Sequence, residues 1–149
     1  MKPRGIVLHT VGVKGDTTAA AIRKYHVEHN KWRDIGYHLV VRKNGEVEFG
    51  RALWTTGAHT EGANDTIGIC ITGDGDSEAW TAAQREAVLV TVVGLCNTHK
   101  LTAEDVCGHR EAPARLRAKP TTKTCPGKLV DLNEVRAALA TRLAVSQWR

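Results

Sequence analysis

The chain has 149 residues, the size of one ordinary domain, so one hydrophobic core is expected over residues 1–149. Apolar residues make up 42% and charged residues 25%, which is typical of a globular protein and excludes a disordered or collagen-like chain. No apolar stretch approaches the ~18 residues of a membrane span. The first residues lack the apolar region of a secretory signal, so we expect the chain to be made in the cytoplasm.

The formal net charge of +5 favours anionic partners such as nucleic acid, a membrane surface or a bacterial wall polymer. The basic residues are scattered, and only 5% of the chain is aromatic. A groove for single-stranded nucleic acid needs basic and aromatic residues interleaved, and that pattern is missing. We therefore expect no nucleic-acid partner.

The first third of the chain predicts a strand, a helix and a hairpin. Residues 5–9 are a short apolar run, typical of a buried strand, and they end on His9. A helix is predicted over 18–26, capped by Asp16 or Thr17. Residues 36–43 and 46–49 are rich in β-formers and flank Asn44-Gly45, which predicts a hairpin turn with both residues at positive φ.

The middle of the chain predicts a loop, a strand and a long helix. Residues 57–65 are polar and contain glycines, which is typical of a loop. Residues 66–72 form a second buried-strand candidate. Thr81 and Gln84 form a capping box before an apolar-rich helix that is expected to end near residue 99.

The last third predicts a short strand at 106–107, an irregular loop over 110–127 and a final helix. Asp131 and Glu134 are expected to cap that helix. Its apolar residues recur at helical spacing and are expected to pack in the core: Leu132, Val135, Leu139 and Leu143. Because strands and helices alternate with one hairpin, the sequence predicts an α/β domain with a central mixed β-sheet flanked by helices.

The four cysteines contain no C-x-x-C pair, which excludes a zinc ribbon and a thioredoxin motif. Cys70 and Cys96 lie in apolar segments and are interpreted as small buried hydrophobic residues. A disulfide between Cys96 and Cys107 stays open at this point.

Three polar residues fall where a buried core would not favour them: His9, His109 and Cys125. Two neutral imidazoles and one thiolate make up a catalytic zinc set, with a fourth position left for water. The three residues lie far apart in the sequence, so their spacing alone does not identify a zinc site and favours structural histidines and a structural thiol. Three other histidines, at positions 26, 29 and 99, are expected on helix surfaces.

Alternation of side chains in extended chain adds three expectations. Lys123 and Cys125 should face the same side, where a lysine can stabilise an oxyanion. Cys107 should share a side with His109, which makes it a reserve ligand. Tyr37 and His38 should point to opposite faces, so that only one of them reaches the site of His9.

An ordered set of motifs resembles the type 2 N-acetylmuramoyl-L-alanine amidases, in particular the amidase-type bacteriophage lysozymes. Peptidoglycan recognition proteins share that fold. The resemblance covers residues 5–145. The motifs are Leu8-His-Thr10, Ile35-Gly-Tyr-His38, Gly45-Glu-Val47 with Gly50-Arg51, Gly57-Ala-His59, Gly62 with Asn64, Thr66-Ile-Gly-Ile69, Gly108-His-Arg-Glu111 and Thr124-Cys-Pro-Gly127.

The resemblance implies zinc-dependent cleavage of the amide bond between N-acetylmuramic acid and L-alanine in peptidoglycan. By position, the zinc ligands are His9, His109 and Cys125. Tyr37 matches a tyrosine that orients water or substrate, and Lys123 matches a lysine that supports the tetrahedral intermediate. The expected substrate-binding residues are His59 and Asn64. Zinc would lower the pKa of bound water to about 7.

Two departures from other family members refine this hypothesis. Cytosolic recycling relatives have an aspartate where this chain has Cys125, and a glutamate in the strand that here contains Cys70. Both differences favour the phage-lysozyme branch. Binding-only recognition proteins typically lack the metal cysteine, so its presence favours an enzyme. The phage-lysozyme branch implies an endolysin that acts on the wall after release, and we expect a monomer.

Three alternatives to a zinc amidase stay open from the sequence. The first is a metal-free module that binds peptidoglycan without cleaving it. The second is a cysteine hydrolase in which Cys125 is the nucleophile and His109 the base. The third, suggested only by the net charge of +5, is a nucleic-acid binder, whose binding would fall steeply with salt. Sensitivity to chelators separates the zinc enzyme from the first two.

Overall fold

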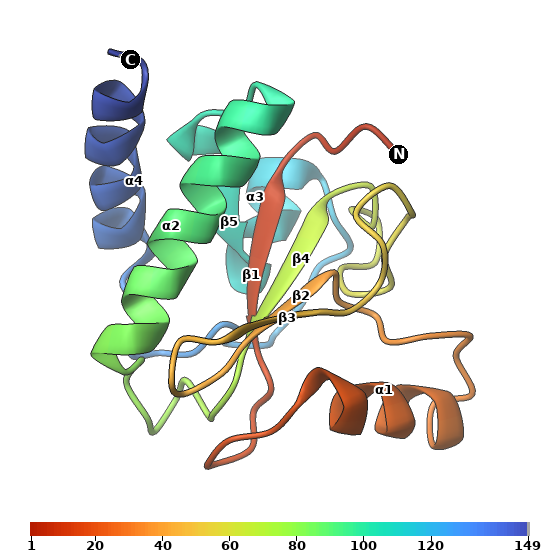
Figure 1. The fold of residues 1–149 in the computed structure, drawn as a ribbon. Coiled ribbons are helices and arrows are strands. Elements are labelled where there is room, and N and C mark those ends of the chain that lie inside the picture. The colour runs from red at the N-terminus through yellow and green to blue at the C-terminus, as the bar shows by residue number, and fades with distance from the viewer. Residues whose placement is uncertain (149) are drawn as a thin grey trace.

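A central mixed sheet forms the middle of the computed structural model, which describes residues 1–148 (Figure 1). Its strands are β1 (Ile6–Thr10), β2 (Leu39–Val41), β3 (Val47–Phe49), β4 (Ile67–Ile71) and β5 (Val106–Gly108). Their order across the sheet is β3-β2-β4-β1-β5. Only β2 and β3 pair antiparallel; the pairs β1–β4, β1–β5 and β2–β4 are parallel. The α/β class and the mixed sheet are therefore confirmed.

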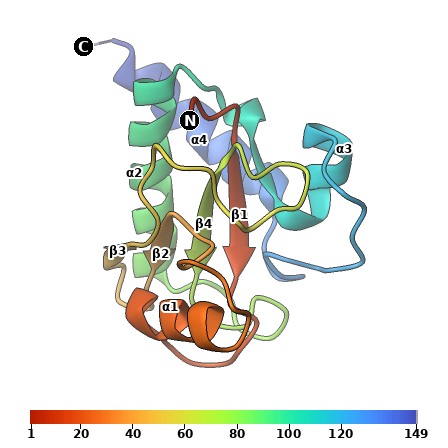
Figure 2. The same ribbon diagram turned by 90° about the vertical axis from the view of Figure 1, so that its right-hand side faces the viewer.

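The helices cover both faces of this sheet (Figure 2). They are α1 (Ala19–Glu28), α2 (Ala82–His99), α3 (Ala112–Leu116) and α4 (Leu132–Ser146), with 3₁₀ turns at Ala103–Asp105 and His109–Glu111. Among residues 1–148, no helix is both long and apolar enough to cross a membrane.

Side-chain alternation along β1 divides the interior into two sides. Ile6 and Leu8 enter the main core, where they meet the buried stripes of α2 and α4. The stripe expected on the last helix is confirmed as part of this core. Val7 enters a second cluster on the opposite face, near α3, and His9 points to that face as well. The site therefore lies on the side of the sheet that α1, α3 and the long loops cover.

Helix starts follow the predicted caps with one exception. The capping box of Thr81 and Gln84 begins α2, and Asp131 accepts two backbone N–H groups at the start of α4. The cap expected for α1 at Asp16 or Thr17 is wrong, because Thr18 accepts the N–H of Ala21. Asp16 instead accepts hydrogen bonds from Thr72 and Arg42.

The predicted hairpin between β2 and β3 is confirmed, but its turn differs from the expectation. Gly45 has a φ of +85°, whereas Asn44 is absent from the residues with positive φ within 1–148. The Gly45 N–H donates to Arg42, and the Arg42 N–H donates to Glu46. This is a longer hairpin loop with a left-handed glycine, for which one positive φ suffices.

The irregular loop predicted over 110–127 is only partly correct. Its first residues form the second 3₁₀ turn and the short helix α3. Pro113 lies in the first turn of α3, where the missing N–H would have had no helical partner. Proline is more often a loop signal, but in the first turn it is compatible with a helix.

All four cysteines are free thiols. The structure therefore answers the question that the sequence left open: Cys96 and Cys107 are not paired. Cys70, Cys96 and Cys107 are buried, as expected of small hydrophobic residues, whereas Cys125 is partly exposed.

Candidate functional site

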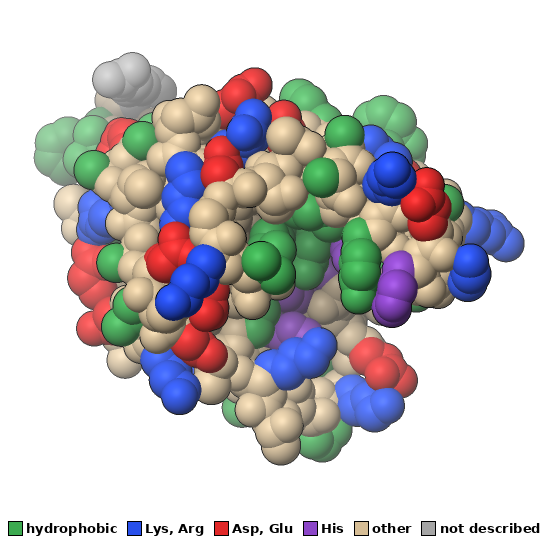
Figure 3. Space-filling view, turned by 90° about the horizontal axis from the view of Figure 1, so that it is seen from below, with side chains coloured by type: hydrophobic (Ala, Val, Ile, Leu, Met, Phe, Trp, Pro, Cys, Tyr) green, Lys and Arg blue, Asp and Glu red, His purple; other side chains and the backbone are tan. Residues whose placement is uncertain are grey.

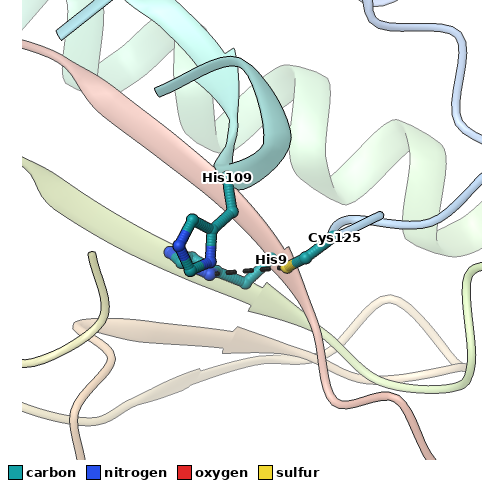
Figure 4. Close-up of side chains that lie close together, drawn as sticks. All are labelled: His9, His109 and Cys125. Atoms are coloured by element: carbon teal, nitrogen blue, oxygen red, sulfur yellow. Dashed lines mark hydrogen bonds between the residues drawn. The ribbon is translucent and has the colours of Figure 1, made fainter. Parts of the chain in front are cut away.

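The three predicted metal ligands meet at one point on the second face of the sheet (Figure 4). One ligand atom from each of His9, His109 and Cys125 lies within 4.8 Å of the others. Sγ of Cys125 is 3.6 Å from Nδ1 of His9, and the His9 and His109 ring centroids are 4.9 Å apart. These groups could hold a metal ion.

Strand pairing explains why residues so distant in sequence become neighbours. Leu8 of β1 pairs with Gly108 of β5 in parallel register, so His9 and His109 follow the paired residues at the same edge of the sheet. The Cys125 loop then crosses this edge, where the backbone N–H of Thr10 donates to Sγ of Cys125 at 3.3 Å.

The reserve ligand Cys107 does not belong to this group. Its register partner is Val7, one pleat before His9 on the same face. There the thiol joins an apolar cluster with Val7, Ala112 and Ala118, and burial raises its pKa to about 12. The expectation that it could replace a ligand is wrong.

Burial keeps the imidazoles in their neutral, ligand-competent form. His9 is 1% exposed, and burial lowers its pKa well below 6.5, with further lowering by His59, His109 and Lys123. Burial and then the charge of Lys123 also lower the pKa of His109. Burial lowers the pKa of His59 to about 3.

A chain of hydrogen bonds selects the tautomer of His9. The carbonyl of Thr66 can only accept, so Nε2 of His59, 3.1 Å away, carries the hydrogen. Nδ1 of neutral His59 is then an acceptor, and it lies 3.0 Å from Nε2 of His9, which must donate. Nδ1 of His9 is left with a free lone pair, and this is the atom that faces Cys125. An imidazole fixed through its other nitrogen is typical of metal-binding histidines.

The surroundings of the Cys125 thiol favour a bound cation. Burial raises its pKa to about 11, while the Thr10 N–H and the charges of Lys123 and Arg110 act in the opposite direction. A thiolate at this place therefore gains from a further positive charge. Two neutral imidazoles beside it complete a donor set that zinc favours.

Tyr37 and Lys123 lie on the groove that contains the three candidate ligands. The Tyr37 ring centroid is 5.2 Å from that of His9, and burial raises the pKa of its phenol well above 10. Lys123 is exposed, and its charge acts on both candidate histidine ligands. His38 turns away, is fully buried, and bonds Gly68 and Thr55, as the alternation predicted.

His59 and Asn64, expected to bind substrate, have structural partners as well as groove surface. Oδ1 of Asn64 accepts the backbone N–H groups of His59 and Thr60, each at 2.8 Å. This holds the loop that carries His59 against His9. Both residues also line the groove.

The groove has a volume of about 980 Å³ and appears in Figure 3 as a hollow with histidines inside and basic side chains near its rim. Besides the residues already described, its lining includes Thr10, His26, Asn30, Trp32, Glu61, Asp74, Asp76 and Lys119.

His26 lies on α1 and is not a candidate ligand, as expected, but it is half-buried rather than a free surface residue. Its Nδ1 accepts the N–H of Gly36 at 2.9 Å, and its ring centroid lies 4.7 Å from that of Trp32 and 5.6 Å from that of Tyr37. The helical spacing of α1 gave no sign of this role, because the partners come from the segment that follows the helix.

Comparisons with known proteins agree with this geometry. The family described as N-acetylmuramoyl-L-alanine amidase matches residues 1–128. The endolysin of Klebsiella phage KP32 is 37% identical over 98 residues, which cover 60% of this chain and 64% of that protein. The chain thus spans less than two thirds of that relative's length.

Solved structures extend the similarity to the fold. The N-acetylmuramoyl-L-alanine amidase LysC from Clostridium intestinale aligns with a TM-score of 0.81 at 28% identity, covering 93% of this chain and 86% of that one. A bumblebee peptidoglycan recognition protein, PGRP-SA, aligns with a TM-score of 0.75 at 25% identity, covering 91% and 82%. Because the family match spans most of the chain, this protein belongs to the N-acetylmuramoyl-L-alanine amidase family.

Proposed function

We propose that this chain hydrolyses the amide bond between N-acetylmuramic acid and L-alanine in bacterial peptidoglycan, using a zinc ion held by His9, His109 and Cys125. The observation that carries the proposal is the convergence of these three donors, within 4.8 Å, in a groove of a protein from an amidase family. When bound, zinc supplies a Lewis acid that activates water at neutral pH and polarises the carbonyl of the amide.

The residues around the three metal donors are assigned the other steps of the reaction. The Lys123 ammonium is the group placed to stabilise negative charge that develops on the carbonyl oxygen. The Tyr37 phenol keeps its proton and orients water or the substrate by donating a hydrogen bond; proton transfer is a secondary role. The polar wall of His59 and Asn64 borders the stem peptide.

The partner that fits this site is the peptidoglycan itself. Its peptides carry carboxylates, and a chain of net charge +5 attracts such a polymer. The endolysin relative leads us to propose that the protein acts on the wall after release from the cell that makes it.

A cysteine nucleophile is a weaker hypothesis for the same residues. Reactive cysteines have lowered thiol pKa values, whereas burial raises that of Cys125. The imidazole that contacts Sγ at 3.6 Å is that of His9, whose tautomer is fixed by His59 rather than by a carboxylate. Both features favour a metal ligand.

Digestion of purified peptidoglycan tests the proposed reaction. We expect peptides with a new free amino group on L-alanine and glycan strands that keep intact lactyl groups, both identified by mass spectrometry. A module that only binds the wall would co-sediment with it and release nothing. Products cut inside the glycan or inside the peptide would contradict the proposed bond.

Lys123→Ala should slow turnover while the metal stays bound. Loss of one oxyanion donor typically costs about 3 kcal/mol, so we expect kcat to fall roughly 100-fold. Lys128→Ala is the matched control, because Lys128 is an exposed lysine of the same loop that does not line the groove. Equal rates for Lys123→Ala and the control would remove Lys123 from the mechanism.

A further inference from the structure

We propose that Arg110 and Asp76 are positioning residues that together fix the loop of Cys125 so that its thiolate can bind the metal. The inference rests on the proposed metal site and extends it to two residues that do not themselves contact the metal. It depends on the hydrogen bonds that the segment from Thr124 to Val130 makes with the rest of the protein.

Arg110 binds the acceptors of this loop. Its guanidinium donates to the carbonyl oxygens of Thr124 (3.1 Å), Gly127 (2.6 Å) and Val130 (2.6 Å). Its backbone N–H donates to the carbonyl of Cys125 at 2.8 Å. One residue therefore holds carbonyls at Cys125 itself and on both sides of it. Since Arg110 directly follows His109, it links two of the candidate ligands.

Asp76 binds donors of the same loop. One carboxylate oxygen accepts the hydroxyl of Thr124, and the other accepts the backbone N–H of Lys128, both at 2.8 Å. The Arg110 guanidinium thus binds carbonyl acceptors of the loop, and the Asp76 carboxylate binds its hydroxyl and N–H donors. Each of the two residues contacts the chain both before and after Cys125.

The two residues come from opposite sides of β1. Asp76 follows β4, Arg110 follows β5, and β1 lies between these strands with His9 near its end. The Cys125 loop is therefore fastened at both neighbours of the strand that provides the first candidate ligand. This arrangement fixes the distance between Cys125 and His9.

Backbone contact leaves the loop little freedom on the Asp76 side. A Cβ on Gly127 would lie 2.1 Å from the carbonyl carbon of Gly75, and Gly75 accepts the N–H of Leu129 at 3.0 Å. The side chains of Lys123, Lys128 and Leu129 are exposed. Polar contacts therefore hold the exposed part of this loop, while Pro126 and Val130 of the same segment are buried.

Zinc binding by variants tests the proposal. Partners that orient metal ligands typically contribute 10–100-fold to metal affinity, so we expect Arg110→Met to raise the zinc dissociation constant by about that factor. Asp76→Ala should weaken binding in the same way. Asp76→Asn keeps an acceptor and should restore most of the affinity. The measurement is competition with a chelating dye, with circular dichroism as the check of folding.

Arg4→Met is the matched control. Arg4 also donates to two backbone carbonyls, those of Leu116 and Gly62, and pairs with Asp65, but it does not contact the Cys125 loop. The zinc affinity of the Arg4→Met variant should equal that of the unaltered protein. Because Asp76 is exposed, Asp76→Ala also provides a folded variant if Arg110→Met does not fold.

Cobalt substitution shows whether the sulfur itself is displaced. The thiolate-to-cobalt charge-transfer band should be strong in the unaltered protein and in Arg4→Met, and weaker in Arg110→Met and Asp76→Ala. Unchanged zinc affinity and an unchanged band in both Arg110→Met and Asp76→Ala would overturn the positioning role of these two residues, but not the metal site. An unaltered protein that binds neither metal would overturn the proposed metal site and this inference with it.

Discussion

Cys125→Ser should abolish both zinc retention and wall hydrolysis. A serine hydroxyl does not ionise at neutral pH, so the site would keep two neutral imidazoles and lose its anionic donor. We expect the zinc affinity to fall by more than about 100-fold, beyond what the loss of an orienting partner costs. The metal-to-protein ratio after gel filtration and the release of wall peptides measure the two effects.

Cys96→Ser is the control for the removal of a thiol. Cys96 is a buried residue of α2, and its Sγ lies 3.9 Å from the carbonyl of Thr102, just before the first 3₁₀ turn. It is not among the candidate ligands, so this variant should keep its zinc and its activity. A Cys125→Ser protein that kept both would show that the sulfur is no ligand.

Arg136→Met should strongly lower the free energy of unfolding. Arg136 is 6% exposed and donates to both oxygens of Glu111 at 2.8 Å, to Asn133 at 2.8 Å and to the carbonyl of Val106 at 3.2 Å. These bonds tie α4 to the turn that begins with His109. Removing one partner of a buried pair typically costs about 3–5 kcal/mol; because Glu111 is partly exposed and keeps the N–H of Gly108, we expect the lower end of that range. Urea denaturation measures the change.

A double variant separates the lost pair from lost packing. In Glu111→Gln/Arg136→Met no charge is left unpaired, so we expect it to recover a large part of the stability lost in Arg136→Met. The surface pair of Arg142 and Glu86 is the comparison, and Arg142→Met should cost at most about 1 kcal/mol. If the double variant were as unstable as Arg136→Met, the uncompensated charge would not be the cause.

Local signals in the sequence predicted most of the secondary structure. The apolar runs, the capping box of Thr81 and Gln84, and the stripe on the last helix depend on residues that are close in the chain, and all three were correct. The error at the start of α1 concerns a choice between similar local partners. Thr18 rather than Asp16 caps α1, because Asp16 is held by Thr72 and Arg42 from the sheet.

The candidate ligands could be predicted because their residue types do not suit the places where they occur. His9 ends an apolar strand, and Cys125 lies in a polar loop. Cys107 was proposed on a different argument, side-chain alternation, which failed because alternation gives the face of a strand but not the position along it. The roles of His26 and Arg110 depend on partners from other segments, such as Gly36 and Gly127. No local pattern reports such contacts.

Removal and return of the metal tests the central claim most directly. The protein is stripped of metal with a chelator, and the new amino-terminal alanine released from purified peptidoglycan is measured before stripping, after stripping, and after one equivalent of zinc is added. We predict that release stops without metal and returns with zinc. Full release of alanine-terminated peptides by the metal-free protein would contradict the claim that zinc, held by two imidazoles and a thiolate, performs the reaction.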